Sequence, residues 1–274
     1  MSAHDEAAAT SRRNILGGAL GAGALGLVGA GAAGLATAGP ASAHGTITTY
    51  STINGARTVY EVNGGLTSWG YRPSFHDRLN SWLVFWNANT PSGYPNASRV
   101  WGYGAHYDGR PTEAHNNGRG FDLSRIYTGS TRRFIARHDI WRNWTGSDLT
   151  TARRHYWATA ASAHHHFRNV LTYLYNADHD NHIHIDNLVS GTGNSSFDSS
   201  SRAQVLHVQA CCRYLWGLGT AIDGVWGSQT SSHSTRVLRA AGVSTGGIGT
   251  QSRWLAFNRA SMRRGYGTQR YPAA

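Results

Sequence analysis

Lysine is absent from this 274-residue chain, so all 25 basic residues are arginines, set against only 14 acidic residues. Charged residues make up 14% of the sequence, well below the roughly 25% that is usual for a soluble domain. With only two cysteines the chain cannot build a disulfide scaffold. Its 34 glycines follow no three-residue period, which excludes a collagen-like structure.

What the sequence does contain is enough to build a core. Hydrophobic residues make up 40% and aromatic residues 11%, with ten tryptophans among them, which excludes wholesale disorder. The formal net charge of +11 and the 15 histidines favour an anionic partner, either nucleic acid, a membrane surface or a cell-wall polymer. Charge alone does not choose among these three.

The first 43 residues predict an export signal. The pair Arg12-Arg13 forms a twin-arginine pattern directly before an uncharged run over 15–38, and an A-x-A cleavage motif follows at 41–43. A transmembrane anchor is the alternative, because the run is long enough to span a bilayer. The many glycines of the run and the cleavage motif favour export. We therefore expect a mature chain that begins near His44, is secreted and wall-associated, and has no membrane attachment.

A polar, serine-rich stretch over 189–202 predicts a flexible linker. It would separate a first domain over 44–188 from a tail over 203–274. Within the first domain, helical and strand-like patterns alternate without a regular βαβ rhythm, which favours α+β over a doubly wound sheet. We expect an α+β domain with a small antiparallel sheet, followed by a small all-α domain.

Several elements of the first domain carry specific expectations. Strand patterns occur over 99–107 and 170–175, and an alanine-rich helix is expected over 150–167. The run His164-His165-His166 lies on that helix and is expected to form a solvated face, because consecutive helical residues point in different directions. Another helix is expected to begin with a capping box at Ser74 and Asp77. Its apolar residues fall on one helical face: Phe75, Leu79, Trp82, Leu83 and Trp86.

The sharpest feature of the sequence is an alternating histidine and isoleucine run. Successive side chains of a strand point to opposite faces, so His182, His184 and Asp186 share one face. Ile183 and Ile185 are then buried on the other face. Imidazole and carboxylate groups are common zinc ligands, so the polar face is a candidate metal site.

A second cluster lies upstream of this run. His115 and Asp122 are seven residues apart, and Gly118 and Gly120 let the chain turn so that their side chains converge. Together with one histidine of the later pair they supply three ligands, which is the number that a catalytic zinc site takes from the protein. A closed structural site with Asp186 as fourth ligand remains an alternative.

The H-x-x-G-x-x-x-D pattern followed by H-x-H resembles the zinc D-Ala-D-Ala peptidases and related murein endopeptidases. Residues 169–186 look most like the bacterial extensin-like C-terminal domain, a branch of that superfamily, and the resemblance covers roughly residues 95–188. It implies that His182 hydrogen-bonds water or a tetrahedral intermediate. It also implies that Zn²⁺ is bound by three residues, His115, Asp122 and His184.

The chain departs from the family pattern at two positions. Asn181 stands where the carboxypeptidases have a glutamate as general base, and Glu113 stands where the family usually has serine. A neutral histidine can act as a base near pH 7, so His182 and His179 are the preferred catalytic bases. Asp180 and Glu113 are the alternatives.

The expected chemistry follows from a bound zinc ion. Zinc would polarise an amide carbonyl and lower the pKa of its bound water toward about 7. A histidine would take the proton and pass it to the leaving amine. A cation would stabilise the oxyanion, and Arg110 or His106 is placed to supply it.

The tail resembles the small helical peptidoglycan-binding domain, through the turn Asp223-Gly-Val-Trp-Gly between two helix-like stretches. Trp226 would be buried or would contact glycan. The alternative is a helical appendage that only stabilises the first domain. Cys211 and Cys212 are adjacent, with Cα atoms about 3.8 Å apart, closer than disulfides prefer. We expect two helical thiols, with a strained vicinal disulfide as the alternative.

These features together predict a secreted, zinc-dependent peptidase that acts on peptide bonds of peptidoglycan, as a carboxypeptidase or an endopeptidase. We expect a monomer whose partners are peptidoglycan and other cell-wall polymers, with no nucleic-acid partner. One alternative is a zinc-stabilised wall-binding protein without catalysis. Another is a secreted metal-dependent nuclease, which the net charge of +11 suggests.

Overall fold

A computed structural model describes residues 45–106, 113–243 and 246–274, and it combines helices with a mixed sheet. The export signal expected over 1–43 lies outside the described residues, and so does Arg110. In the part of the chain that is described, no helix has the length and apolarity needed to cross a membrane.

The main sheet has seven strands in the order β2-β3-β5-β6-β9-β8, with β7 also paired to β6. All neighbours are antiparallel except β3 and β5, which run parallel. A separate antiparallel pair is formed by β1 (Thr48–Tyr50) and β4 (Trp69–Tyr71). The main strands are β2 (Thr52–Ile53), β3 (Ala56–Tyr60), β5 (Arg99–Gly102), β6 (Gly120–Thr128), β7 (Thr131–Ile135), β8 (Asn169–Leu171) and β9 (Ile183–Asp186). The expected α+β class, with a mainly antiparallel sheet, is confirmed.

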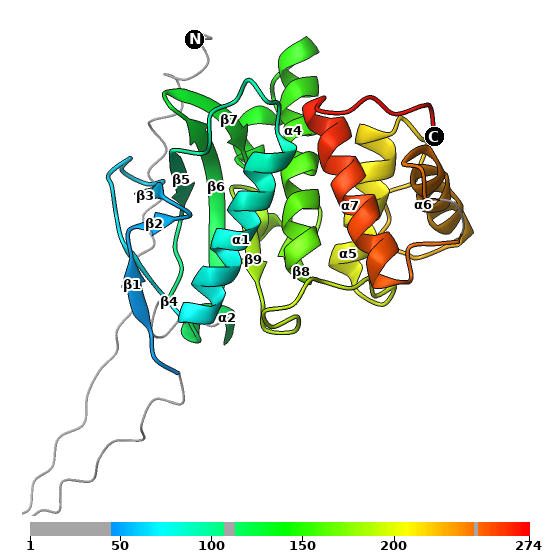
Figure 1. Cartoon of the computed structure of the whole chain (residues 1–274). Helices are drawn as coiled ribbons and strands as arrows, with labels where there is room; N and C mark the ends of the chain where they lie inside the picture. The colour runs from blue at the N-terminus through cyan, green and yellow to red at the C-terminus, as the bar shows by residue number, and fades with distance from the viewer. Residues whose placement is uncertain (1–44, 107–112, 244–245) are drawn as a thin grey trace, which may run out of the picture. The chain divides into compact units, whose positions relative to one another are not determined.

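Helices form the other half of the fold. Figure 1 shows α1 (Pro73–Asn89) and α4 (Gly146–His166) beside the sheet, with the helices of the tail beyond α4. Those tail helices are α5 (Arg202–Ala210), α6 (Ser228–Ala240) and α7 (Gln251–Tyr266), and a π-helical turn η2 (Cys211–Leu215) follows α5. Among the described residues there are also three short helices: α2 (Glu113–Asn116), α3 (His138–Trp141) and the 3₁₀ turn η1 (Ala177–His179).

The structure confirms the predicted apolar face of α1, but not its predicted capping box. All five residues of that face are fully buried. The capping box is wrong, because the residue before the helix is Arg72, and it makes no side-chain cap. Pro73 occupies the first turn instead, where its fixed φ suits a helix and its missing N–H is not needed.

The three histidines at the end of α4 are buried, so the expected solvated face is wrong. His164 is fully inaccessible, and His165 and His166 are each 5% exposed. The reason is tertiary packing: α4 contacts β7, β8 and α1, and it also contacts α5 and α7 from the tail. A helix covered on so many sides has little solvent-facing surface.

The tail packs directly on the first part of the chain. Residues His44–Ala274 form one compact unit rather than two. A Cβ added to Gly265 of α7 would lie 2.6 Å from the Cβ of Ala158 of α4, so the two helices approach closely. The stretch expected to be a linker is part of this packing, because Ser195 is fully buried and accepts a hydrogen bond from Trp254 Nε1 at 2.7 Å. The helical content of the tail is as expected, but the spatial separation is not.

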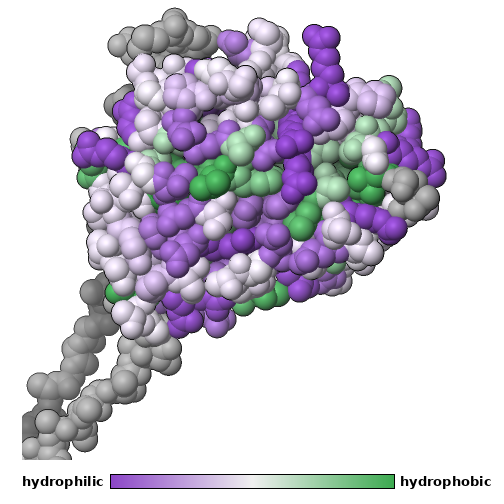
Figure 2. Space-filling model, viewed as in Figure 1, coloured by the Kyte–Doolittle hydropathy of each residue, from purple (hydrophilic) through white to green (hydrophobic). Residues whose placement is uncertain are grey.

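Two further features concern the described surface and the thiols. Five large hydrophobic side chains are exposed among the described residues: Val62, Leu66, Val84, Val189 and Val225. On the face seen in Figure 2, hydrophilic residues predominate and hydrophobic ones form small groups. Cys211 and Cys212 are free and both buried, so the vicinal disulfide is not formed. Burial raises the pKa of the Cys212 thiol to about 12, so this thiol is unreactive near neutral pH.

Candidate metal centre

Strands β6 and β9 bring two of the predicted ligands together. In their antiparallel register Asp122 and His184 are direct Cα partners. The residues that flank them on both strands are fully buried on the other face: Phe121, Leu123, Ile183 and Ile185. The predicted alternation is therefore confirmed, and the two polar side chains lie next to each other on one face of the sheet.

His115 reaches the same place from the short helix α2, which contacts β6 (Figure 1). The chain leaves α2 through Gly118, which has a φ of 61°. A Cβ at this position would lie 2.5 Å from Ile47 Cδ1 and 2.8 Å from the backbone nitrogen of Arg72. Only glycine permits both this conformation and this close approach, so Gly118 fixes the path that sets His115 over β6.

The three predicted ligands converge. Asp122 Oδ1 lies 3.2 Å from His115 Nε2 and 3.0 Å from His184 Nδ1, and these two nitrogens are 3.3 Å apart. One ligand atom from each residue falls within 4.8 Å of the others. All three residues are buried, with at most 6% of each exposed. This buried cluster has the composition and the spacing to hold a metal ion.

The outer ring nitrogens of both histidines are held by acceptors. His115 Nδ1 lies 2.5 Å from the carbonyl oxygen of Ala105, and His184 Nε2 lies 3.2 Å from Asp186 Oδ2. A carbonyl and a carboxylate can only accept, so these outer nitrogens carry hydrogen. In the neutral rings the inward nitrogens then keep their lone pairs. Metal-binding histidines are oriented in this way by their outer partners.

Asp186 belongs to this outer layer and is not a fourth ligand. It lies behind His184, at the ring nitrogen that points away from Asp122. Its Oδ1 accepts hydrogen bonds from the Leu188 backbone N–H at 3.0 Å and from Asn169 Nδ2 at 3.1 Å. The alternative of a closed site with Asp186 as fourth ligand is therefore wrong.

The buried cluster favours a bound positive charge, as the pKa shifts of Asp122 and His184 indicate. Burial tends to raise the pKa of Asp122, but its contacts with the imidazoles of His115 and His184 outweigh it and hold this pKa well below its usual range. Burial tends to lower the pKa of His184, but hydrogen bonds to Asp122 and Asp186 outweigh it and raise this pKa to about 9. Without a metal the cluster therefore keeps a proton at neutral pH. A divalent cation bound by the same atoms would replace that proton.

Both preferred base candidates lie at this cluster. His182 Nε2 is 3.5 Å from Asp122 Oδ1, while His182 Nδ1 is 2.7 Å from Asn181 Oδ1, which accepts its hydrogen. His179 donates through Nδ1 to Asn176 Oδ1, and its ring centroid lies 5.1 Å from that of His182. Burial, followed by the charges of His182 and His184, lowers the pKa of His179 to about 4. His179 is therefore neutral at pH 7.

The alternative base candidates are placed differently. Glu113 is exposed on α2. Asp180 bonds away from the cluster, because His138 Nδ1 lies 2.5 Å from its Oδ1 and Arg142 donates to its Oδ2 at 2.8 Å. The Asp139 backbone N–H also donates to the Asp180 carbonyl at 3.0 Å. Helix α3 and the residue after it thus fasten the loop that carries both preferred bases, a role that the sequence did not indicate.

Glu61 is a second group that sequence reasoning missed. It is a buried carboxylate that accepts from Ser124 Oγ at 2.8 Å, from Arg125 at 2.7 Å and from Arg137 at 3.0 Å. Ser124 is two residues beyond Asp122 on β6, so this ion-pair network adjoins the metal cluster. With both guanidinium partners and Ser124 bound to its carboxylate, Glu61 is a structural anchor between β3 and β6.

Comparisons with protein-family models, with curated proteins and with solved structures found no match for this chain. The resemblance described from its sequence motifs therefore stays a prediction. The geometry and chemistry of the site therefore carry the functional proposal.

Proposed function

We propose that this protein is a secreted, zinc-dependent peptidase that hydrolyses peptide bonds of peptidoglycan. One observation carries the proposal: His115 Nε2, Asp122 Oδ1 and His184 Nδ1 converge in a buried cluster. The sequence resemblance to murein peptidases points the same way. The excess of arginine also suits a location among wall polymers, which are commonly anionic.

The donor set fits zinc. Two imidazole nitrogens and one carboxylate oxygen are a common catalytic set, and both imidazoles are oriented by outer acceptors. When bound there, zinc supplies Lewis acidity that polarises a carbonyl and makes water more acidic. Asp122 contributes a negative charge that offsets part of the charge of a divalent cation.

The proton is handled by the chain's own histidines. His182 is the better placed base, because its hydrogen is fixed on Nδ1 by Asn181 and its Nε2 faces the cluster. At Nε2 it accepts the proton of the attacking water and returns it to the leaving amine. The ring of His179 lies 5.1 Å from that of His182, and His179 stays neutral at pH 7, so it adds no competing charge.

The tail supplies a surface for the insoluble substrate. Gln209 shapes the turn, because its Oε1 accepts from the backbone N–H of Asp223 at 3.1 Å and of Gly224 at 2.9 Å. Trp226 is half-buried, with its ring centroid 4.7 Å from that of Phe197, and its neighbour Val225 is 63% exposed. We assign wall binding to this turn, where an aromatic ring and an exposed apolar side chain lie together.

A second candidate function is a zinc-stabilised wall-binding protein without catalysis. It is favoured by Asn181, which stands where the resemblance implies a glutamate base and which engages His182. In that case the metal would stabilise the fold and no bond would be cut.

Mass spectrometry of digested peptidoglycan separates these functions. The wild-type protein should release new muropeptides, a chelator should stop the release, and His184→Ala should release none. Asp148→Asn is the matched control, because Asp148 is an exposed acid at the start of α4. Zinc-loaded wild-type protein that binds sacculi but releases nothing would favour the non-catalytic function. Chelator-sensitive nicking of plasmid DNA without any muropeptide release would favour the nuclease.

A further inference from the structure

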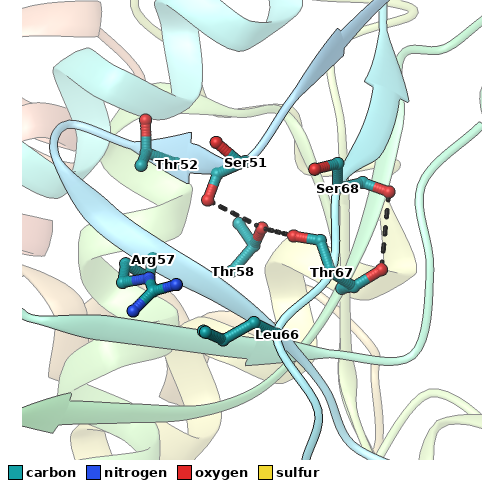
Figure 3. A pocket seen from close by; sticks show the side chains of 7 residues that line it. All are labelled: Ser51, Thr52, Arg57, Thr58, Leu66, Thr67 and Ser68. Atoms are coloured by element: carbon teal, nitrogen blue, oxygen red, sulfur yellow. Dashed lines mark hydrogen bonds between the residues drawn. The ribbon is translucent and has the colours of Figure 1, made fainter.

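We propose that a pocket at the edge of the main sheet binds an acidic amino sugar, one that carries a carboxylate beside its hydroxyls. The choice of a wall sugar depends on the proposed function. The cavity measures about 490 Å³ and is lined by Ser51, Thr52, Arg57, Thr58, Leu66, Thr67 and Ser68 (Figure 3). It lies on β2, β3 and the segment that follows, whereas β6 and β9 carry the metal cluster. It is therefore a separate site.

The floor of this pocket is fixed by the protein alone. Thr58 is fully buried, and its hydroxyl lies 2.5 Å from the Thr67 carbonyl oxygen and 3.1 Å from that of Ser51. Backbone hydrogen bonds run from the Thr58 N–H to Ser51 and from the Thr67 N–H to Thr58, each at 3.0 Å. Thr58 therefore holds both Ser51 and Thr67, which line the pocket, in fixed positions. A ligand would enter a preformed pocket without having to order it.

The pocket also presents a positive charge, the guanidinium of Arg57. Arg57 is exposed, and among the described residues none forms a hydrogen bond or an ion pair with this group. Its Cα partner on β5 is Arg99, whose guanidinium stacks on Tyr127 and donates to the Gly129 carbonyl. The partners of Arg99 therefore leave Arg57 as the charged group that lines the pocket. A ligand carboxylate at Arg57 would supply a counterion.

The remaining lining groups suit a sugar. In the view of Figure 3, Ser51, Thr52 and Ser68 lie on one side of the pocket, with Arg57 and Leu66 on the other. Hydroxyls both donate and accept, so they match the hydroxyls of a saccharide. Leu66 is 53% exposed and offers an apolar contact for the methyl group of an acyl or lactyl substituent. A carboxylate, hydroxyls and a methyl group occur together in an N-acetylated sugar with a lactyl ether.

A matched pair of ligands tests this proposal. N-acetylmuramic acid and N-acetylglucosamine differ by the lactyl ether, which brings the carboxylate. In a titration of the full chain followed by nuclear magnetic resonance, N-acetylmuramic acid should shift signals of residues 51–68. It should bind about two- to fivefold more tightly than N-acetylglucosamine, the range of an exposed ion pair. Arg57→Ala should abolish this difference, whereas Arg270→Ala, the loss of another exposed arginine, should keep it.

Several outcomes would overturn it. Equal affinity for both sugars, or an unchanged preference in Arg57→Ala, would remove the role of Arg57. Shifts confined to the Trp226 turn, or no shifts at millimolar sugar, would remove the site. Lactate that binds as tightly as the whole sugar would reduce the pocket to an anion site. Repeating the titration with His184→Ala separates this proposal from the peptidase function, because sugar binding here should not need the metal cluster.

Discussion

Zinc affinity should rise steeply with pH between 7 and 9. In the metal-free protein the pKa of His184 is about 9, because hydrogen bonds to Asp122 and Asp186 outweigh the effect of burial. Below that pH His184 holds a proton that zinc must displace. Each pH unit below 9 then weakens apparent binding about tenfold, since one pKa unit corresponds to about 1.36 kcal/mol. From pH 7 to pH 9 the affinity should rise on the order of 100-fold.

Competition with a chromophoric chelator in buffers of fixed ionic strength measures this slope. Calorimetry in two buffers of different ionisation enthalpy should show about one proton released per zinc at pH 7.5. Asp186→Asn provides the internal comparison, because it removes one of the two groups that raise the pKa of His184. Its affinity should level off at a lower pH, and its plateau should be about 10- to 100-fold weaker, as is usual when an outer partner of a ligand is lost. A wild-type affinity that does not change between pH 7 and 9 would refute this reasoning.

Four further predictions concern single residues. His115→Ala and Asp122→Ala should lose the one zinc ion that elemental analysis finds in the wild-type chain; full occupancy in both would reject the ligand assignment. His182→Ala should keep zinc and lower turnover by ~10²–10⁴-fold in a muropeptide assay. Unchanged turnover would reject His182 as the general base. Asp180→Asn should speed hydrogen exchange in η1 and the residues that follow without loss of zinc, whereas Asp148→Asn should change neither. Acidification from pH 6.5 to 5 should lower the free energy of unfolding by about 1.6 kcal/mol through His207 alone, because burial lowers its pKa to about 4 and the proton is taken up almost entirely by the unfolded chain. Urea melts of His207→Gln that keep the full pH dependence would contradict this.

The parts of the fold that sequence predicts well are those with strong local periodicity. The buried face of α1 and the alternation of β9 follow directly from the spacing of their apolar residues. The three ligands were predictable because they lie in two short motifs, one with His115 and Asp122 and the other with His184. For His115 and Asp122 the intervening glycines indicate the turn, and for His184 the strand fixes the direction.

The parts that sequence missed depend on partners far away in the chain. The histidines at the end of α4 are buried by side chains far away in sequence. His164 packs on α5 and α7, and both His165 and His166 pack on Phe85 of α1, which no local pattern reveals. Glu61 and Asp180 take their roles from arginines and histidines of other elements. The serine-rich stretch was typical of a linker by composition, yet Ser195 within it is a buried hydrogen-bond acceptor.

The contact between α4 and α7 has a consequence for the order in which this protein is made. Tyr266, the last residue of α7, lies 2.7 Å from Thr159 of α4 through its hydroxyl, across 107 positions of sequence. The side of α4 that α7 covers therefore gains its cover only after the residues up to Tyr266 have been synthesised. Until then one side of this alanine-rich helix faces solvent. Closure of this side of the core is thus a long-range contact that can form only late in synthesis.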